Sequence, residues 1–422
     1  MKNILLISIT TLMLLFSQLL LNGNTIYDTV TMGPSYSNDV FYSMENGIVK
    51  IEPRSNWDIA FYSLRWSAGI SINDGMGVEL YTYPLGDTSD WNSVEVSAIE
   101  EWVPMYNSDT IWEDGAFNRN ALGHPDYGWG IYNMVTHDVV GDSIYILKLA
   151  NGNLKKMWIE RKNSTSNTYY FKYANIDGSE EVSEVISADP FLDKIFIYYS
   201  ISNQSIIDRE PPMDAWDFVF SRYIGTVFDL DGNPSPYPVV GVLNNLETGA
   251  NKFLDVDEHF EDYFTLPMLF ERSPIGSDWK SFNMETFAWE IEENHAFFVQ
   301  TQDGDVYKLV FDYFSGMGTG RIGFTKKLIS LASIPETENK AELFRINPNP
   351  AQQFLNLHLE VEHVHTAQLQ IYDMSGRKLV DRTLNPENDL HQVDLSHFNN
   401  GFYLVKLLAD GVQHTQKLIV NK

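Results

Sequence analysis

Short segments of alternating apolar and polar residues recur along most of this 422-residue chain. Successive side chains of a strand point to opposite faces, so this alternation indicates strands with a buried face. The clearest such segments are Ile144–Leu149, Thr168–Tyr173, Lys194–Ser200, Ala296–Gln300 and Val306–Phe311. Between segments stand pairs that tolerate the positive φ of tight hairpins: Asn151-Gly152, Asp177-Gly178, Asp231-Gly232, Asp303-Gly304 and Asp410-Gly411. Helical periodicity is scarce after the N-terminus, and the sequence predicts an all-β fold of antiparallel sheets.

Cores must hold this fold together, because the chain has no cysteine. Disulfides, thiolate chemistry and a lipid-modified cysteine anchor are therefore excluded. A hydrophobic content of 44%, with 14% aromatic residues, is sufficient for two or three domains of this total length.

The N-terminus predicts export. Lys2 precedes an apolar run from Ile4 to Leu21, followed by Asn22 and Gly23. This order is typical of a signal peptide, here residues 1–23, and a membrane anchor is the alternative. No later segment approaches membrane length, so we expect no integral membrane segment after cleavage.

The net charge of −28 argues against two classes of partner. Nucleic acid and anionic membrane surfaces are both negatively charged and would repel this surface. Solubility outside the cell is the simplest interpretation of the acidity.

Two parts of the chain resemble each other. Phe41-Tyr42-Ser43 precedes Trp57-Asp58, and Tyr198-Tyr199-Ser200 precedes Trp216-Asp217. Later, Tyr145–Trp158 resembles Phe298–Phe311. The common order predicts two duplicated β units, 24–190 and 191–333, forming either one joint domain or two.

Each Trp-Asp element predicts a core strand. Its alternation places Trp57, Ile59 and Phe61 on one face, and Trp216, Phe218 and Phe220 likewise. The aspartate beside each tryptophan is tempting as a catalytic acid, but for a single carboxylate without a partner the role of a turn or strand-end hydrogen-bond acceptor is favoured.

Residues 334–343 are polar and predict a linker. The remaining residues, 344–422, alternate in short strands that a small β-sandwich would bury. The predicted strands are Phe354–Val361, Ala367–Tyr372, Lys378–Leu384, Asp389–Leu395, Gly401–Leu408 and Thr415–Val420.

Ordered motifs run through this last segment. They are carried by Pro348, Asn349, Pro350, Tyr372, Gly376, Gly401 and Tyr403. The segment resembles the type A C-terminal sorting domain of the type IX (Por) secretion system, with Asn347 where that family often carries Tyr. The resemblance implies a partner, the type IX machinery of Bacteroidetes-type bacteria, and a destination at the cell surface or in the medium. It says nothing about what the rest of the chain does.

A second resemblance concerns the N-terminal part. Val40–Tyr62, Ile70–Gly75, Val306–Phe311 and Gly320–Phe324 are similar to segments of the HmuY family. That resemblance implies an all-β haem-binding protein with two axial iron ligands from loops. This chain departs from the family in its length, its duplication and its lack of a lipoprotein cysteine.

Candidate axial ligands for haem are His124, within a Gly-rich aromatic segment, and His137 beside Asp138. Met105 and Met134 are possible thioether partners. For each histidine a structural role is the alternative, and for each methionine it is buried packing.

Other chemistry has little support in the sequence. His259 and His295 are scattered, no His-Glu-x-x-His zinc pattern occurs, and 229–233 favours a turn over a calcium loop. No nucleophile elbow or phosphate-binding glycine loop is present. We therefore expect a secreted, non-enzymatic binding protein for haem or a related tetrapyrrole. The alternatives are a surface adhesion protein without haem and a glycan-binding or carbohydrate-active protein.

Overall fold

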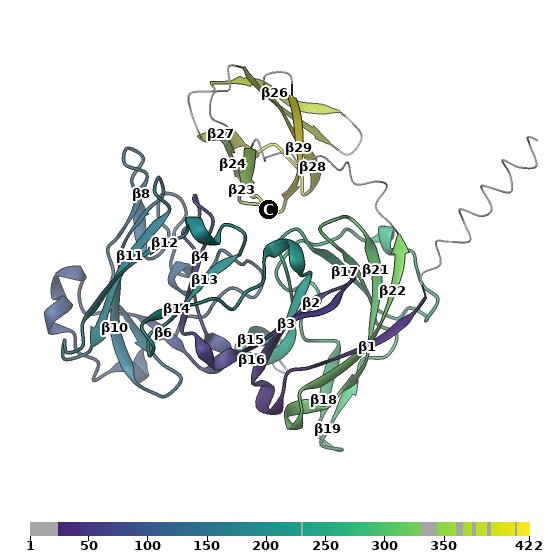
Figure 1. The fold of residues 1–422 in the computed structure, drawn as a ribbon, viewed down its shortest axis with the longest axis horizontal. Coiled ribbons are helices and arrows are strands. Elements are labelled where there is room, and N and C mark those ends of the chain that lie inside the picture. Colours follow the sequence, from purple (N-terminus) through teal and green to yellow (C-terminus); the bar gives the residue numbers. More distant parts are fainter. Residues whose placement is uncertain are drawn as a thin grey trace, which may run out of the picture. The chain divides into compact units, whose positions relative to one another are not determined.

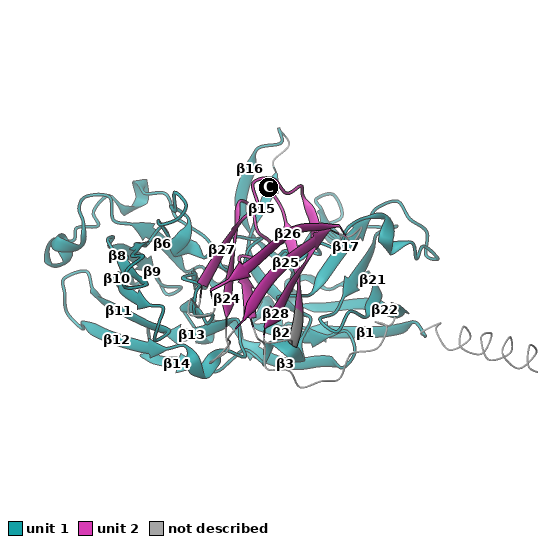
Figure 2. Cartoon of the chain, turned by 90° about the horizontal axis from the view of Figure 1, so that it is seen from above, with its two compact units in different colours: residues 1–333 teal, residues 334–422 magenta. Residues whose placement is uncertain are grey.

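The computed structural model describes residues 24–228, 231–330, 344–359, 366–373, 377–385, 390–409 and 412–422. The chain divides into two compact units, 1–333 and 334–422 (Figure 2). The predicted signal peptide and linker lie outside the described residues. The fold is predominantly β, as predicted, and every described helical segment is a short 3-10 turn.

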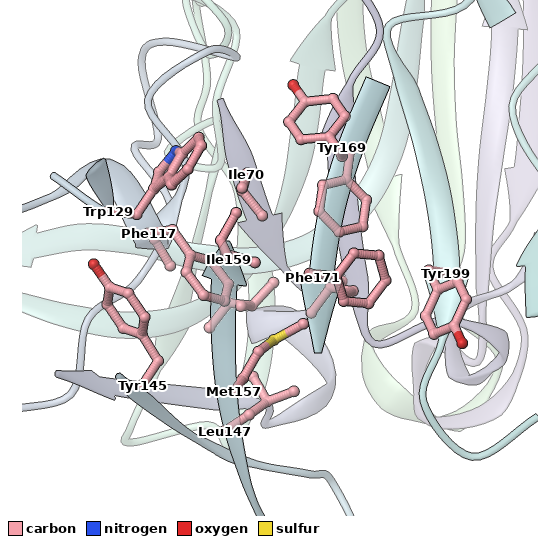
Figure 3. Close-up of a cluster of buried hydrophobic side chains, with 14 of the residues drawn as sticks. Ile70, Phe117, Trp129, Tyr145, Leu147, Met157, Ile159, Tyr169, Phe171 and Tyr199 are labelled. Carbon is pink, nitrogen blue, oxygen red and sulfur yellow. The ribbon is translucent and has the colours of Figure 1, made fainter. Parts of the chain in front are cut away.

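Two β-sandwiches make up the first unit (Figure 1). The first has a seven-stranded sheet of β6 (Glu79–Thr82), β7 (Gly130–Tyr132), β8 (Asp138–Gly141), β9 (Tyr145–Lys148), β10 (Leu154–Asn163), β11 (Thr168–Asn175) and β12 (Val182–Ser187). Facing it is a four-stranded sheet of β4 (Ile59–Tyr62), β5 (Ile70–Ile72), β13 (Phe196–Ser200) and β14 (Ser205–Ile207). Figure 3 shows the aromatic core between them, with Phe117, Trp129 and Phe171 among its side chains.

The second sandwich repeats this plan. Its five-stranded sheet contains β1 (Ile26–Thr31), β17 (Gly249–Phe253), β20 (Ala296–Gln300), β21 (Val306–Phe314) and β22 (Arg321–Ser330). Its four-stranded sheet contains β2 (Asn38–Ser43), β3 (Gly47–Pro53), β15 (Phe218–Phe228) and β16 (Pro234–Asn244). A separate hairpin joins β18 (Lys280–Asn283) to β19 (Ala288–Ile291).

The two four-stranded sheets also pack against each other. Ile59 and Phe61 of β4 enter the first core, whereas Ala60 and Tyr62 enter a cluster shared with Phe41 and Val219. The middle strands are therefore buried on both faces. For this reason the sequences of these strands are almost continuously apolar and do not alternate strictly between apolar and polar residues.

Pairing in these middle sheets joins distant parts of the chain. β2 pairs with β15, and β4 pairs with β13. Each Tyr-Ser segment thus lies beside the Trp-Asp element from the other part of the chain. Strands from either side of residue 190 occur in both sandwiches.

The Trp-Asp elements differ from prediction in one respect. Trp57 and Trp216 do not share a core with Ile59 and Phe218, but pack in the layer between the sandwiches. Regular strand begins only after the aspartate in each element. The strict alternation that placed the tryptophans therefore does not extend back to them.

The second unit is a small sandwich of two sheets. One contains β23 (Phe344–Asn347), β24 (Phe354–Leu359) and β27 (Leu390–Asp394). The other contains β25 (Ala367–Asp373), β26 (Lys378–Leu384), β28 (Gly401–Ala409) and β29 (Val412–Val420). All six predicted strands are present, and their inward residues form one core.

Candidate functional site

The β7–β8 hairpin carries His137 at the end of its turn. Its backbone is left-handed, with φ of 59°, and its ring is half-buried. The His137 Nδ1 lies 2.7 Å from the Tyr132 hydroxyl in a hydrogen bond. Trp66 packs edge-on against the imidazole, with ring centroids 5.9 Å apart. His137 is therefore held in a defined orientation.

His124 reaches the same tyrosine from the preceding loop. Its exposed ring lies 5.5 Å from the Tyr132 ring, and the His137 ring lies 6.1 Å from it. Partial burial raises the pKa of Tyr132, so its hydroxyl stays protonated at neutral pH. The two histidines selected from the sequence thus share one neighbour.

Three exposed apolar side chains stand near this pair in the sequence. Leu122, Met134 and Val135 are 92%, 73% and 87% exposed. Met134 is therefore not packed in a core, whereas Met105 is half-buried, and its sulfur is a hydrogen-bond acceptor for Thr82. Met134 and Val135 lie in the hairpin turn and Leu122 in the preceding loop; large exposed apolar side chains that gather in one patch are typical of binding surfaces.

A second hairpin, β18–β19, has the same turn, which was not predicted from the sequence. The Asn133 side chain accepts the N–H groups of Val135 and Thr136 at 2.8 and 3.2 Å. Asn283 accepts those of Glu285 and Thr286 at 2.8 and 3.1 Å. The signal was present as Asn-Met-Val-Thr at 133–136 and Asn-Met-Glu-Thr at 283–286.

The second turn ends differently. Phe287 takes the left-handed position, with φ of 52°, that His137 takes in the first. Met284 and Phe287 are 71% and 75% exposed. Of these two hairpins, the first carries an imidazole, that of His137, beside its exposed apolar side chains.

Among the described residues of the first unit, the other histidines are His259 and His295. His259 is exposed beside Glu258, at 3.4 Å. Across the described ranges, no three histidine or carboxylate side chains converge as a metal site requires.

In the second unit, Asn349 connects the start of the domain to its last strand. Its side chain donates to the Lys417 carbonyl at 2.9 Å and accepts the Ile419 N–H at 2.8 Å. Pro348 and Pro350 flank it in the segment between β23 and β24.

Other motif residues fix turns and strand ends. The Tyr403 hydroxyl donates to the Asn399 carbonyl at 2.8 Å, and that of Tyr372 donates to the Gln370 side chain at 2.7 Å. Gly401 has φ of 151°, which residues with a side chain rarely adopt. Gly376 lies outside the described residues.

Residues 345–421 match the family described as "Secretion system C-terminal sorting domain". The second unit is a type IX sorting domain. The sorting domain directs export, so the protein is secreted or held at the cell surface and interacts with the type IX machinery.

Two solved structures show weak similarity to the chain. One is dimeric latent PorU from Porphyromonas gingivalis, with 11% identity over 93% of this chain and 34% of that chain, and a TM-score of 0.17. The other is the extracellular domain of what is described as a one-component system from B. thetaiotaomicron, with 9% identity over 66% and 48% and a TM-score of 0.15. The chain spans about a third and about half of these structures, and TM-scores this low carry no argument about its fold.

A comparison with curated proteins found no match. In the part of the chain that the structure describes, no helix has the length and apolarity needed to span a membrane.

Proposed function

We propose that this type IX cargo is a non-enzymatic binding protein that takes haem or a related tetrapyrrole at the β7–β8 hairpin. The observation that carries the proposal is the contact of both His124 and His137 with Tyr132. Imidazole is a common axial ligand of haem iron, and a porphyrin face needs apolar surroundings. Leu122, Met134 and Val135 supply exposed apolar surface.

His137 suits the role of one axial ligand. If His137 held the iron through Nε2, its neutral ring would carry a proton on Nδ1, and that N–H would donate a hydrogen bond to the Tyr132 oxygen, 2.7 Å away. Such a bond on the second ring nitrogen fixes both the tautomer and the ring orientation. His124, on the exposed loop, would supply the second ligand.

We further propose that residues 24–190 and 191–333 are two duplicated, HmuY-like β units that form one joint domain. Support comes from corresponding contacts in the two parts. Asn73 donates to the carbonyls of Arg54 and Trp57, and Asn245 donates to those of Met213 and Trp216. The two Asn-Met-x-Thr hairpins add a further correspondence, with Phe287 in place of His137.

Haemin titration of the purified protein tests the proposal. The wild-type protein should give a sharp, shifted Soret band that His137→Ala abolishes and His124→Ala changes or abolishes. Tyr132→Phe should weaken affinity by roughly 10 to 100-fold, since it removes the bond that orients His137. Phe287→Ala, in the corresponding hairpin, is the matched control and should bind as wild type. A free-haemin spectrum with the wild-type protein would exclude haem.

Adhesion without haem is the second candidate, because both hairpin tips expose methionine and a further large apolar residue. An adhesive function predicts that cells attach less to surfaces when these residues become polar. One double variant is Met134→Ser with Val135→Ser, and the other is Met284→Ser with Phe287→Ser. Haemin binding would be absent in every variant.

A further inference from the structure

A cavity of about 60 Å³ lies in the layer between the two four-stranded sheets. Trp57 and Trp216 line it from corresponding positions of the two Trp-Asp elements, and Arg209, Glu210 and Arg272 line it from the loops after β14 and β17. Nearly all of its lining residues are buried. The volume is several times the roughly 10–15 Å³ that a single water molecule needs.

Both tryptophans that line this cavity carry an unused hydrogen-bond donor. The indole N–H groups of Trp57 and Trp216 are buried and have no acceptor among the described residues. Their rings are fixed, since Trp57 packs edge-on against Tyr198 and Trp216 against Phe41. A buried donor without an acceptor costs about 1–3 kcal/mol, so a guest that accepts from both is favoured.

Arg272 adds a third unused donor and a buried charge. Its guanidinium donates to the Ser108 carbonyl and stacks 4.3 Å from the Trp112 ring, while its Nε–H has no acceptor. Among the described residues it forms no ion pair, although Asp74 attracts it over a longer distance. An unpaired buried cation is unfavourable unless an anion compensates it.

The carboxylates on the cavity wall already have partners. Asp39 pairs with Arg209 at 2.7 Å and with Arg54 at 3.3 Å. Glu210 accepts the N–H groups of Ile195 and Phe196 and the Tyr198 hydroxyl, at 2.6, 3.3 and 3.1 Å. Burial raises the pKa of Glu210 to about 7, which limits its repulsion of an anion at neutral pH.

We propose that this cavity is a structural site for a small inorganic anion of the size of chloride, held by Arg272 and the indole N–H groups of Trp57 and Trp216. The anion accepts from all three donors and compensates the buried guanidinium. The small volume excludes larger organic anions. Because its ligands come from both sandwiches, the anion joins the two middle sheets.

Thermal unfolding of the full secreted chain tests the site. Chloride is exchanged for gluconate, which is too large for the cavity, at constant ionic strength and pH. An anion that binds only the folded state stabilises that state. Once the anion concentration exceeds the dissociation constant, the stabilisation grows with the logarithm of the concentration. We expect the wild-type midpoint to rise by a few degrees with chloride, and Arg272→Met and Trp216→Phe to lose most of that rise.

Arg119→Met is the matched control, because Arg119 is an exposed arginine paired with Asp114, and it should keep the full chloride response. Bromide provides a readout that needs no variant: a bromide-soaked crystal of the wild-type protein should show an anomalous peak in the cavity. Equal wild-type midpoints in chloride and gluconate, or a cavity without bromide and filled by water alone, would overturn the proposal. Neither readout involves haem or the β7–β8 hairpin, so the site stands or fails separately from the proposed function.

Discussion

The Asp217 carboxylate accepts the backbone N–H of Met44 at 2.6 Å, across 173 positions of the chain. Asp58 makes the corresponding bond to the N–H of Ile201 at 2.7 Å. Both aspartates are therefore strand-end acceptors, as their sequence context predicts, and both bonds lie just after the strands that pair with the Trp-Asp elements.

Removing either carboxylate should destabilise the protein. Asp217→Ala leaves the Met44 N–H buried and unpaired, which costs about 1–3 kcal/mol. Asp58→Ala should cost a similar amount. Urea denaturation measures both free energies of unfolding. Asp303→Ala, which changes an aspartate outside these bonds, is the comparison and should stay within about 0.5 kcal/mol of wild type.

Asp39 holds two buried arginines, Arg54 and Arg209. Asp39→Ala leaves two buried positive charges without their partner, so we expect a loss of about 3–5 kcal/mol. The exposed pair of Arg65 and Asp189 is the control, and Asp189→Ala should cost less than about 1 kcal/mol. If Asp39→Ala and Asp189→Ala lowered the free energy of unfolding by similar amounts, burial would not be the reason that the Asp39 ion pairs matter.

Stability should depend on pH through Glu210. Burial raises the pKa of its carboxyl from 4.5 to about 7, so between these values the folded state keeps a proton that the unfolded chain releases. The free energy of unfolding therefore falls as pH rises from about 4.5 to about 7. Asp74, whose pKa burial raises to about 6, contributes in the lower part of this range.

Glu210→Gln should remove the Glu210 share of this dependence. Denaturation at a series of pH values gives the free energy of unfolding of wild type and variant. The difference between these two free energies should change between pH 4.5 and 7 and be constant above pH 7. Parallel curves across this range would show that Glu210 is not protonated in the folded state.

Lys280 should act in the opposite direction at alkaline pH. Burial lowers the pKa of its ammonium to about 7, and the group lies 4.1 Å from the Trp279 ring. Between pH 7 and about 10.5 the unfolded chain binds a proton that the folded state has released, so this contribution to stability rises with pH. Lys280→Met should lose the rise in stability, whereas Lys50→Met, at a half-buried lysine paired with Glu52 at 3.0 Å, should keep it.

Asn349 should matter for export through the stability of the sorting domain. Asn349→Ala loses both bonds to β29, which should lower the stability of that unit by about 1–2 kcal/mol and reduce the secreted fraction. Deleting residues 345–422 should retain the protein inside the cell envelope. Immunoblots of medium, surface and envelope fractions measure both effects, with Thr415→Ala, at an exposed position of β29, as the control.

Local pattern was sufficient for many elements. The strand Ala296–Gln300 has the predicted bounds, and the glycines of Asn151-Gly152 and Asp303-Gly304 adopt the predicted positive φ of 84° and 90°. These features depend on neighbouring residues alone. Trp57 and Trp216 were placed on the wrong face because the alternation was extended beyond the ends of their strands.

The candidate site was only partly visible in the sequence. His124 and His137 could be selected as residues, but not Tyr132, which brings them together, because ring contacts depend on how the hairpin folds back on the preceding loop. The cavity residues were invisible as a group, since Trp57 and Arg272 are separated by more than half of the chain.

The sequence by itself determined the β class, the turns and the sorting domain, because alternation, turn chemistry and ordered motifs are properties of short segments. Tertiary structure decided which strands pair, which side chains lie between the sandwiches and which donors lack acceptors. In an antiparallel sheet any apolar strand can pair with several others, and the choice depends on the burial of whole faces. That burial is fixed only when β2 and β15, and β4 and β13, come together from distant parts of the chain.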